Sequence, residues 1–153
     1  MNNATPEREY LKTLTLLFVE DEELTREMFS EFLSRLVGVL FTAKNGAEGL
    51  DACREHCPDI IITDLQMPVM DGLTMLREIR KLDKCKSIPV FVMTAYEEVD
   101  YLNRAFPLGV FEYVSKPLET GKFSESLFTC ARHLLNEQKL GQAREKESLH
   151  ENQ

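Results

Sequence analysis

The stretch that decides the fold of this chain is Ile60-Ile61-Ile62-Thr63-Asp64. Cys57-Pro58-Asp59 precedes the run and Met67-Pro68 follows it, so it is typical of a short, fully buried strand that ends in a turn. An unpaired carboxylate is costly to bury, and such a strand normally excludes one. Ligands and chemistry, however, lie at the carboxyl ends of the strands in an open parallel α/β sheet. We therefore predict that Asp64 is a functional residue.

Three further apolar runs end in polar residues. Leu14–Val19 leads into Glu20 and Asp21, Ile88–Met93 leads into Thr94, and Val110–Ser115 leads into Lys116. If these strands are parallel neighbours, one rim of the sheet collects these four polar side chains together with Asp64.

That rim has the composition of a metal-dependent phosphoryl site. Its three carboxylates repel one another unless a cation lies among them. A small set of oxygen ligands suits Mg²⁺, which keeps bound waters and often shares a substrate phosphate. The Lys116 ammonium and the Thr94 hydroxyl are suitable partners for the phosphate oxygens.

The segments between the strands have helical periodicity. Leu24, Met28, Phe32 and Leu36 recur every four residues, with Phe29 and Leu33 beside them, and predict one apolar stripe. Helices are also predicted over Ala47–His56, around Leu73–Ile79, over Glu97–Phe106 before Pro107, and from Glu119, while Val39–Thr42 predicts a short strand.

This alternation of strand and helix, repeated five times, predicts an α/β fold. We expect a doubly wound, five-stranded parallel sheet of the flavodoxin type, with strand order 2-1-3-4-5 and helices on both faces. That order places Asp21 and Asp64 on neighbouring strands at the topological switch point.

From about Leu14 to Asn136 the chain resembles the receiver domain of two-component response regulators. The resemblance implies that Asp64 is the phospho-acceptor, that Glu20 and Asp21 hold Mg²⁺, and that the backbone carbonyl of Gln66 is a further metal ligand. It also implies that Lys116 contacts the phosphoryl group, that Thr94 and Tyr113 are switch residues, and that Lys116-Pro117 is a cis peptide.

The resemblance also carries expectations about partners. A sensor histidine kinase or a phosphotransfer protein is the expected phosphodonor. The expected output and homodimer surface is the face built from Glu97–Phe106, Val110–Ser115 and the helix that begins near Glu119. The chain is expected to catalyse only its own phosphotransfer and dephosphorylation, so it is not predicted to be an enzyme in the usual sense.

Composition narrows the remaining possibilities. A net charge of −8 argues against nonspecific nucleic-acid binding. No apolar run is long enough for a membrane span, and the N-terminus lacks a signal-peptide pattern. We therefore expect a cytoplasmic protein. Residues 1–13 are predicted to be an N-terminal extension, residues 14–136 the receiver domain, and residues 137–153 a polar helical or disordered tail. The cysteines lack paired CxxC spacing and are predicted to be reduced thiols.

Two alternative functions use the same residues. A haloacid-dehalogenase-like phosphatase also employs a strand-end Asp and Mg²⁺, but its general acid is a second Asp where this chain has Gln66. A pseudo-receiver would act as a docking module without phosphorylation, which the complete set of rim residues argues against.

Overall fold

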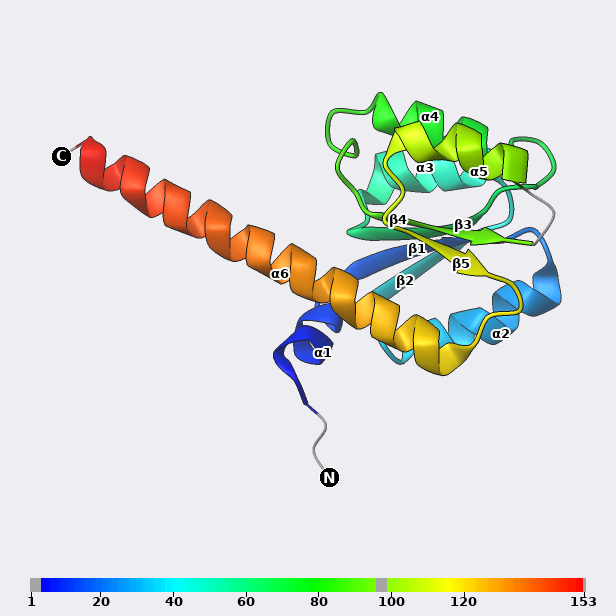
Figure 1. Ribbon diagram of the computed structural model, residues 1–153, viewed down its shortest axis with the longest axis horizontal. Coiled ribbons are helices and arrows are strands. Elements are labelled where there is room, and N and C mark those ends of the chain that lie inside the picture. Colours follow the sequence, from blue (N-terminus) through cyan, green and yellow to red (C-terminus); the bar gives the residue numbers. More distant parts are fainter. Residues whose placement is uncertain (1–3, 96–98, 153) are drawn as a thin grey trace.

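The computed structural model describes residues 4–95 and 99–152 and contains the predicted five-stranded parallel sheet (Figure 1). The strand order is β2-β1-β3-β4-β5, and all four pairings are parallel. The strands are β1 (Thr15–Val19), β2 (Val39–Ala43), β3 (Ile60–Asp64), β4 (Val90–Thr94) and β5 (Glu112–Ser115). The predicted fold class and strand order are therefore confirmed.

Helices cover both faces of the sheet. In Figure 1, α1, α2 and α6 lie on one face, and α3, α4 and α5 lie on the other. The helices are α1 (Pro6–Leu11), α2 (Glu23–Ser34), α3 (Gly46–His56), α4 (Gly72–Arg80), α5 (Val99–Ala105) and α6 (Thr120–Glu151). A 3₁₀ turn, η1 (Phe106–Leu108), follows α5, so Pro107 ends the α-helix as predicted. The predicted start of this helix at Glu97 lies outside the described residues.

The sheet divides the apolar interior into two layers because successive strand residues point to opposite faces. On the side of α1, α2 and α6, the strands contribute Leu16, Phe18, Ile60, Ile62, Phe91 and Met93. On the side of α3 and α4, they contribute Leu17, Val19, Ile61, Val90 and Val92. With both faces covered, every residue of β3 and β4 is buried, which explains the unbroken apolar runs Ile60–Ile62 and Val90–Met93.

The N-terminal segment contains a helix that the sequence analysis did not predict. Thr5 caps α1 by accepting a hydrogen bond from the Arg8 N–H at 3.3 Å, and Leu11 at its end is fully buried. Helix α1 packs against α6, where Glu7 forms an ion pair with Arg132 at 2.7 Å. The Arg8 guanidinium carbon also lies 4.4 Å from the centroid of the Phe128 ring.

The predicted apolar stripe of α2 is only partly correct. Leu33 is fully buried and Phe29 packs against the core, whereas Leu24 and Met28 are 63% and 62% exposed. Phe32 and Leu36 of the predicted stripe also pack against the core. Only the first part of the stripe, at Leu24 and Met28, is presented to solvent.

Helix α6 is 32 residues long and extends well beyond the sheet (Figure 1). Its first part buries Phe123, Leu127, Cys130 and Ala131 in the core. Residues 136–152 are all exposed, including Leu140 and Leu149, and the helix remains unbroken to Glu151. Among the described residues, no helix has the combination of length and apolar character that a membrane span requires.

Candidate functional site

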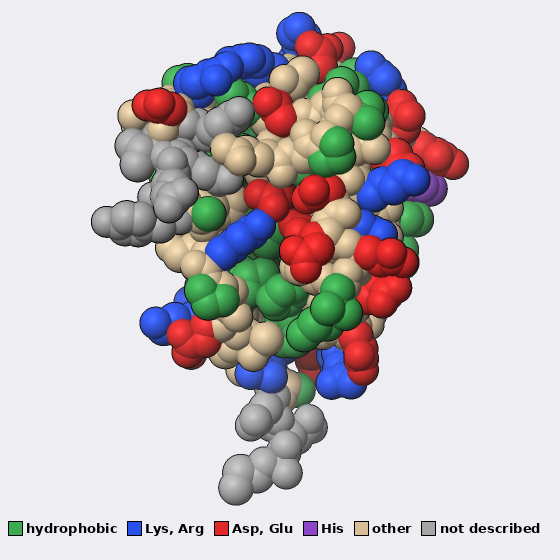
Figure 2. Space-filling view, turned by 90° about the vertical axis from the view of Figure 1, so that its right-hand side faces the viewer, with side chains coloured by type: hydrophobic (Ala, Val, Ile, Leu, Met, Phe, Trp, Pro, Cys, Tyr) green, Lys and Arg blue, Asp and Glu red, His purple; other side chains and the backbone are tan. Residues whose placement is uncertain are grey.

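The predicted site residues lie at the carboxyl-terminal edge of the sheet. Asp64 and Thr94 are the last residues of β3 and β4, Glu20 and Asp21 follow β1, and Lys116 follows β5. Figure 2 shows acidic side chains gathered in the middle of this face, with a basic side chain beside them and hydrophobic side chains adjoining.

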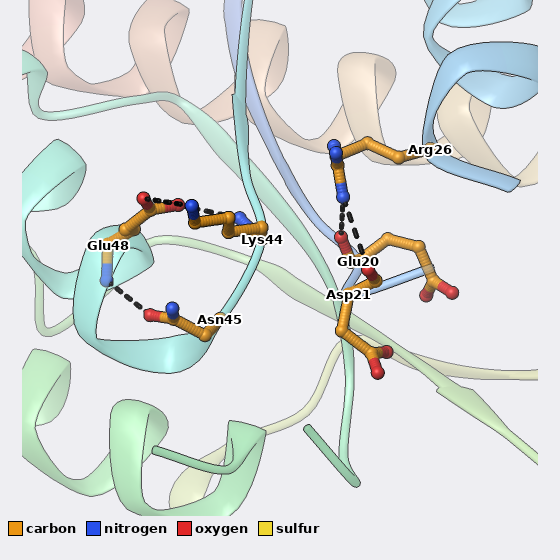
Figure 3. A network of polar contacts seen from close by, with 6 residues as sticks. All are labelled: Glu20, Asp21, Arg26, Lys44, Asn45 and Glu48. Atoms are coloured by element: carbon orange, nitrogen blue, oxygen red, sulfur yellow. Dashed lines mark hydrogen bonds and ion pairs between the residues drawn. The ribbon is translucent and has the colours of Figure 1, made fainter. Parts of the chain in front are cut away.

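An arginine that the sequence analysis did not select fixes the backbone around the acidic pair. The Arg26 guanidinium donates to the carbonyl of Glu20 at 2.9 Å and to that of Asp21 at 3.3 Å (Figure 3). Because Arg26 lies on the first turns of α2, it holds the loop after β1 against the start of that helix. The signal for this role in the sequence was the closeness of Arg26 to the acidic pair, since it lies five residues after Asp21.

The Asp64 carboxylate is buried and has two protein partners. Its Oδ1 accepts a hydrogen bond from the Leu65 N–H at 2.8 Å, and its Oδ2 lies 2.5 Å from the Lys116 ammonium. The Thr63 hydroxyl donates to the Asp64 carbonyl at 2.8 Å. Gly72 packs so closely that a Cβ atom there would lie 2.1 Å from the Asp64 carbonyl oxygen, so this position requires glycine.

The three carboxylates meet as the sequence predicted. Glu20, Asp21 and Asp64 each place an oxygen within 4.8 Å of the others. Burial is the main reason that the pKa of Glu20 rises to about 7, and the nearby Asp64 carboxylate adds to the rise.

The chemistry of these donors fits a hard divalent cation. Glu20 is 2% exposed, and its Oε2 is one of two buried side-chain polar atoms among the described residues that lack a hydrogen-bond partner. A cation bound among the carboxylates would supply the missing partner of Glu20 and offset the repulsion between the acids.

The remaining predicted residues occupy the rim around Asp64. Thr94 is buried, and its carbonyl accepts a hydrogen bond from the Lys116 N–H at 2.9 Å, which joins the ends of β4 and β5. Lys116-Pro117 is a cis peptide, as expected. The Tyr113 hydroxyl donates to the Leu102 carbonyl of α5 at 3.3 Å, so this half-buried ring links β5 to α5. Gln66 lies in the loop after Asp64 with an exposed side chain.

The loop between β2 and α3 borders the site and is held by several hydrogen bonds. Asn45 caps α3 by accepting from the Glu48 N–H at 2.9 Å, and the Glu48 carboxylate accepts from the Lys44 N–H at 2.9 Å (Figure 3). The Gly46 N–H donates to the Met70 carbonyl at 2.9 Å, which joins this loop to the one that follows Asp64.

Comparison with known proteins identifies the family to which this chain belongs. The family model described as response regulator receiver domain matches residues 16–128. The chain is 32% identical over 113 residues to the polar-differentiation response regulator DivK of Brucella anthropi, an alignment that covers 74% of this chain and 92% of DivK. The chain therefore belongs to the response regulator receiver domain family. Its members are signalling modules of two-component systems whose switch depends on phosphorylation.

Solved structures agree with this assignment. The N-terminal domain of an uncharacterized protein (WS1339) from Wolinella succinogenes is similar with a TM-score of 0.76 and 34% identity, over 82% of this chain and 99% of that domain. The receiver domain of the sensor histidine kinase PA1611 from Pseudomonas aeruginosa shares the fold, with a TM-score of 0.70 and 22% identity, over 78% of this chain and 98% of that one. That structure is described with a magnesium ion coordinated in its active-site cleft.

Proposed function

We propose that Asp64 accepts a phosphoryl group from a phosphohistidine of a partner protein and that this modification switches the chain between two signalling states. The observation that carries the proposal is the buried Asp64 carboxylate, held between the Leu65 N–H and the Lys116 ammonium with Glu20 and Asp21 alongside. A nucleophile, a cation site and a basic group for the phosphoryl oxygens thus lie together.

In the proposed reaction an oxygen of Asp64 attacks the phosphorus in line, and the bond from phosphorus to the histidine nitrogen breaks. Glu20, Asp21, Asp64 and the Gln66 carbonyl would hold Mg²⁺, which would supply positive charge to offset the charge on the phosphoryl oxygens. The Lys116 ammonium moves from the Asp64 carboxylate to a phosphoryl oxygen, because phosphorylation removes the negative charge of the carboxylate. The Thr94 hydroxyl, at the end of the neighbouring strand β4, is proposed to donate to another phosphoryl oxygen.

The direct test uses a small phosphodonor with and without Mg²⁺. Intact-mass measurement is expected to show one added phosphoryl group, labile in base and absent from Asp64→Asn. Asp51→Asn removes an exposed carboxylate on α3 and serves as the matched control. Persistent labelling of the Asp64→Asn variant would contradict the assignment, and an unlabelled wild-type protein would favour the pseudo-receiver alternative.

The histidine-bearing partner, a sensor kinase or a phosphotransfer protein, is proposed to dock beside the rim. The exposed Leu24 and Met28 of α2 lie one helical turn apart at this end of the molecule. A neighbouring cavity of about 440 Å³ is lined by Thr25, Phe29, Met93, Lys116, Pro117 and Leu118. An exposed apolar row beside a reactive carboxylate is a suitable contact for an apolar surface that carries the phosphohistidine.

This docking site is separable from the chemistry. Met28→Glu is expected to slow phosphotransfer from a phosphohistidine partner and to leave labelling by a small phosphodonor unchanged. Leu140→Glu places the same charge on an exposed leucine of α6 and serves as the control. Equal transfer rates in Met28→Glu and the wild type would show that the partner docks on another surface.

The proposed output surface is the α5–β5–α6 face, through which we also propose that the chain forms a homodimer. Strand β5 is an edge strand, and Tyr113 ties it to α5 through the Leu102 carbonyl. Sedimentation with and without a stable phosphoryl mimic tests dimer formation.

We further propose that the chain is cytoplasmic, binds no nucleic acid directly, and turns over no external substrate. Sustained hydrolysis of a phosphomonoester would instead support the phosphatase alternative.

A further inference from the structure

Three of the four cysteines converge at the edge of the sheet opposite the acidic rim. Cys53 and Cys57 belong to the last turn of α3 and its C-terminal cap, and Cys85 lies in the segment between α4 and β4. Both Cys57 and Cys85 thus precede a strand at its amino-terminal end. The predicted phosphorylation site does not use any of these thiols.

Cys57 and Cys85 are arranged as a pair. Their sulfur atoms lie 3.9 Å apart, at van der Waals contact, although the residues are 28 positions apart in the chain. The Cys57 thiol also lies 3.5 Å from the Lys84 carbonyl, and the Cys85 thiol lies 3.8 Å from the Cys53 carbonyl. A disulfide requires about 2.05 Å between the sulfurs. An approach of about 1.9 Å, shared between a helix cap and a loop, would therefore close the bond.

The two thiols differ in their access to solvent. Cys57 is exposed and lines a pocket of about 190 Å³ together with Arg54, Lys84 and Cys85. Cys85 is buried, and burial raises the pKa of its thiol. Cys57 is therefore the thiol that meets an oxidant first, and Cys85 is placed to react second.

We propose that Cys57 and Cys85 form a reversible, redox-sensitive disulfide with hydroperoxides as the oxidant. The Cys57 thiolate attacks the peroxide, the O–O bond breaks, and Cys57 becomes a sulfenic acid while hydroxide or an alkoxide leaves. The Cys85 sulfur then attacks the Cys57 sulfur, the S–O bond breaks, and the released hydroxide leaves as water with the Cys85 proton. The two thiols are oxidised by two electrons, and the peroxide is reduced by two.

The Arg80 side chain connects the segment that contains Cys85 to the proposed output face. The Arg80 guanidinium donates to the carbonyls of Cys85 at 3.2 Å and Ile88 at 2.8 Å. It also donates to the carbonyls of Leu108 at 2.8 Å and Gly109 at 2.9 Å, in the turn between α5 and β5. Movement of Cys85 toward α3 would therefore displace the Arg80 side chain, which also holds the turn between α5 and β5.

Peptide mapping tests the pairing. The fully reduced chain is treated with a small excess of hydrogen peroxide, remaining thiols are blocked with N-ethylmaleimide, and the protein is digested with trypsin. Cleavage after Lys and Arg places the four cysteines in four separate peptides, at 45–54, 55–77, 85–86 and 123–132. The expected product is a cross-link between peptides 55–77 and 85–86, with the loss of two hydrogens, which a thiol reductant reverses.

Matched variants complete the experiment. Cys57→Ser changes an exposed thiol and is expected to abolish the cross-link, whereas Cys130→Ser, on the other face of the sheet, is expected to leave it unchanged. Closing a loop of this length is expected to raise the melting temperature by about 5–10 °C. A cross-link through Cys53, a stable sulfenic acid at Cys57 without a cross-link, or an oxidised protein that melts no higher than the reduced one would overturn the proposal.

Discussion

Glu20 offers a quantitative test of the site in the metal-free protein. Its pKa rises from 4.5 to about 7, chiefly through burial and then through the Asp64 carboxylate. In the unfolded chain the same carboxyl titrates near its ordinary value. Between pH 4.5 and pH 7 the folded state therefore binds a proton that the unfolded state has released, and stability falls as the pH rises through this interval.

The size of the effect follows from the two pKa values. A tenfold change in proton affinity corresponds to about 1.4 kcal/mol, so a rise from 4.5 to about 7 corresponds to about 3 kcal/mol. Glu20→Gln removes the titrating group with little change in shape. We expect the variant to gain stability relative to the wild type as the pH rises, by up to about 3 kcal/mol between pH 5 and pH 8.

Urea denaturation in the presence of a chelator, at each pH from 5 to 8, measures this difference. Glu23→Gln, at an exposed position on α2, is the matched control and is expected to follow the wild type. Saturating Mg²⁺ is expected to stabilise the wild type and to reduce the advantage of Glu20→Gln, since the cation binds the ionised carboxylate of the folded state. A constant difference between wild type and Glu20→Gln from pH 5 to pH 8 would refute the reasoning.

Three further predictions address other parts of the structure. Val69 has a φ of 68°, a left-handed conformation that disfavours a β-branched residue, and it is 85% exposed; Val69→Asn is expected to stabilise the protein by about 1 kcal/mol in urea denaturation, and a loss of stability would contradict this. Leu11→Ala is expected to lower the free energy of unfolding by about 2–5 kcal/mol, because Leu11 is fully buried between α1 and the core; an effect below 1 kcal/mol would show that α1 does not belong to the cooperative fold. In the wild type, a phosphoryl mimic is expected to change hydrogen exchange at Tyr113 and along α5. Thr94→Ala is expected to accept phosphate at Asp64 without that change; a response equal to that of the wild type would exclude the Thr94 hydroxyl as the link.

The strands and the rim were predictable because their signals are local. A β-branched run such as Ile60–Ile62 is buried on both faces in this sheet, and the polar residue that ends each strand can be read directly from the sequence. Strand order then placed Asp64 beside the acidic pair, and the structure brings these carboxylates together.

What the sequence analysis missed depends on contacts between distant segments. Helix α1 has its start signal in Thr5 and Pro6, but only packing against α6 makes so short a helix stable. On α2, the predicted stripe is apolar throughout, but Phe32 and Leu36 pack against the core whereas Leu24 and Met28 remain exposed. The proximity of Cys57 and Cys85 likewise arises from the way that α3 lies beside the segment after α4.

The length of α6 has a mechanical consequence. From Ala131, the last residue that the helix buries in the core, to Glu151 there are 20 residues, a distance of about 30 Å at 1.5 Å per residue. The exposed part is thus a lever arm whose fulcrum lies at the edge of the core. A tilt of about 10° at Ala131 would carry Glu151 through about 5 Å, so a small repacking beside β5 becomes a large displacement at the far end of the helix.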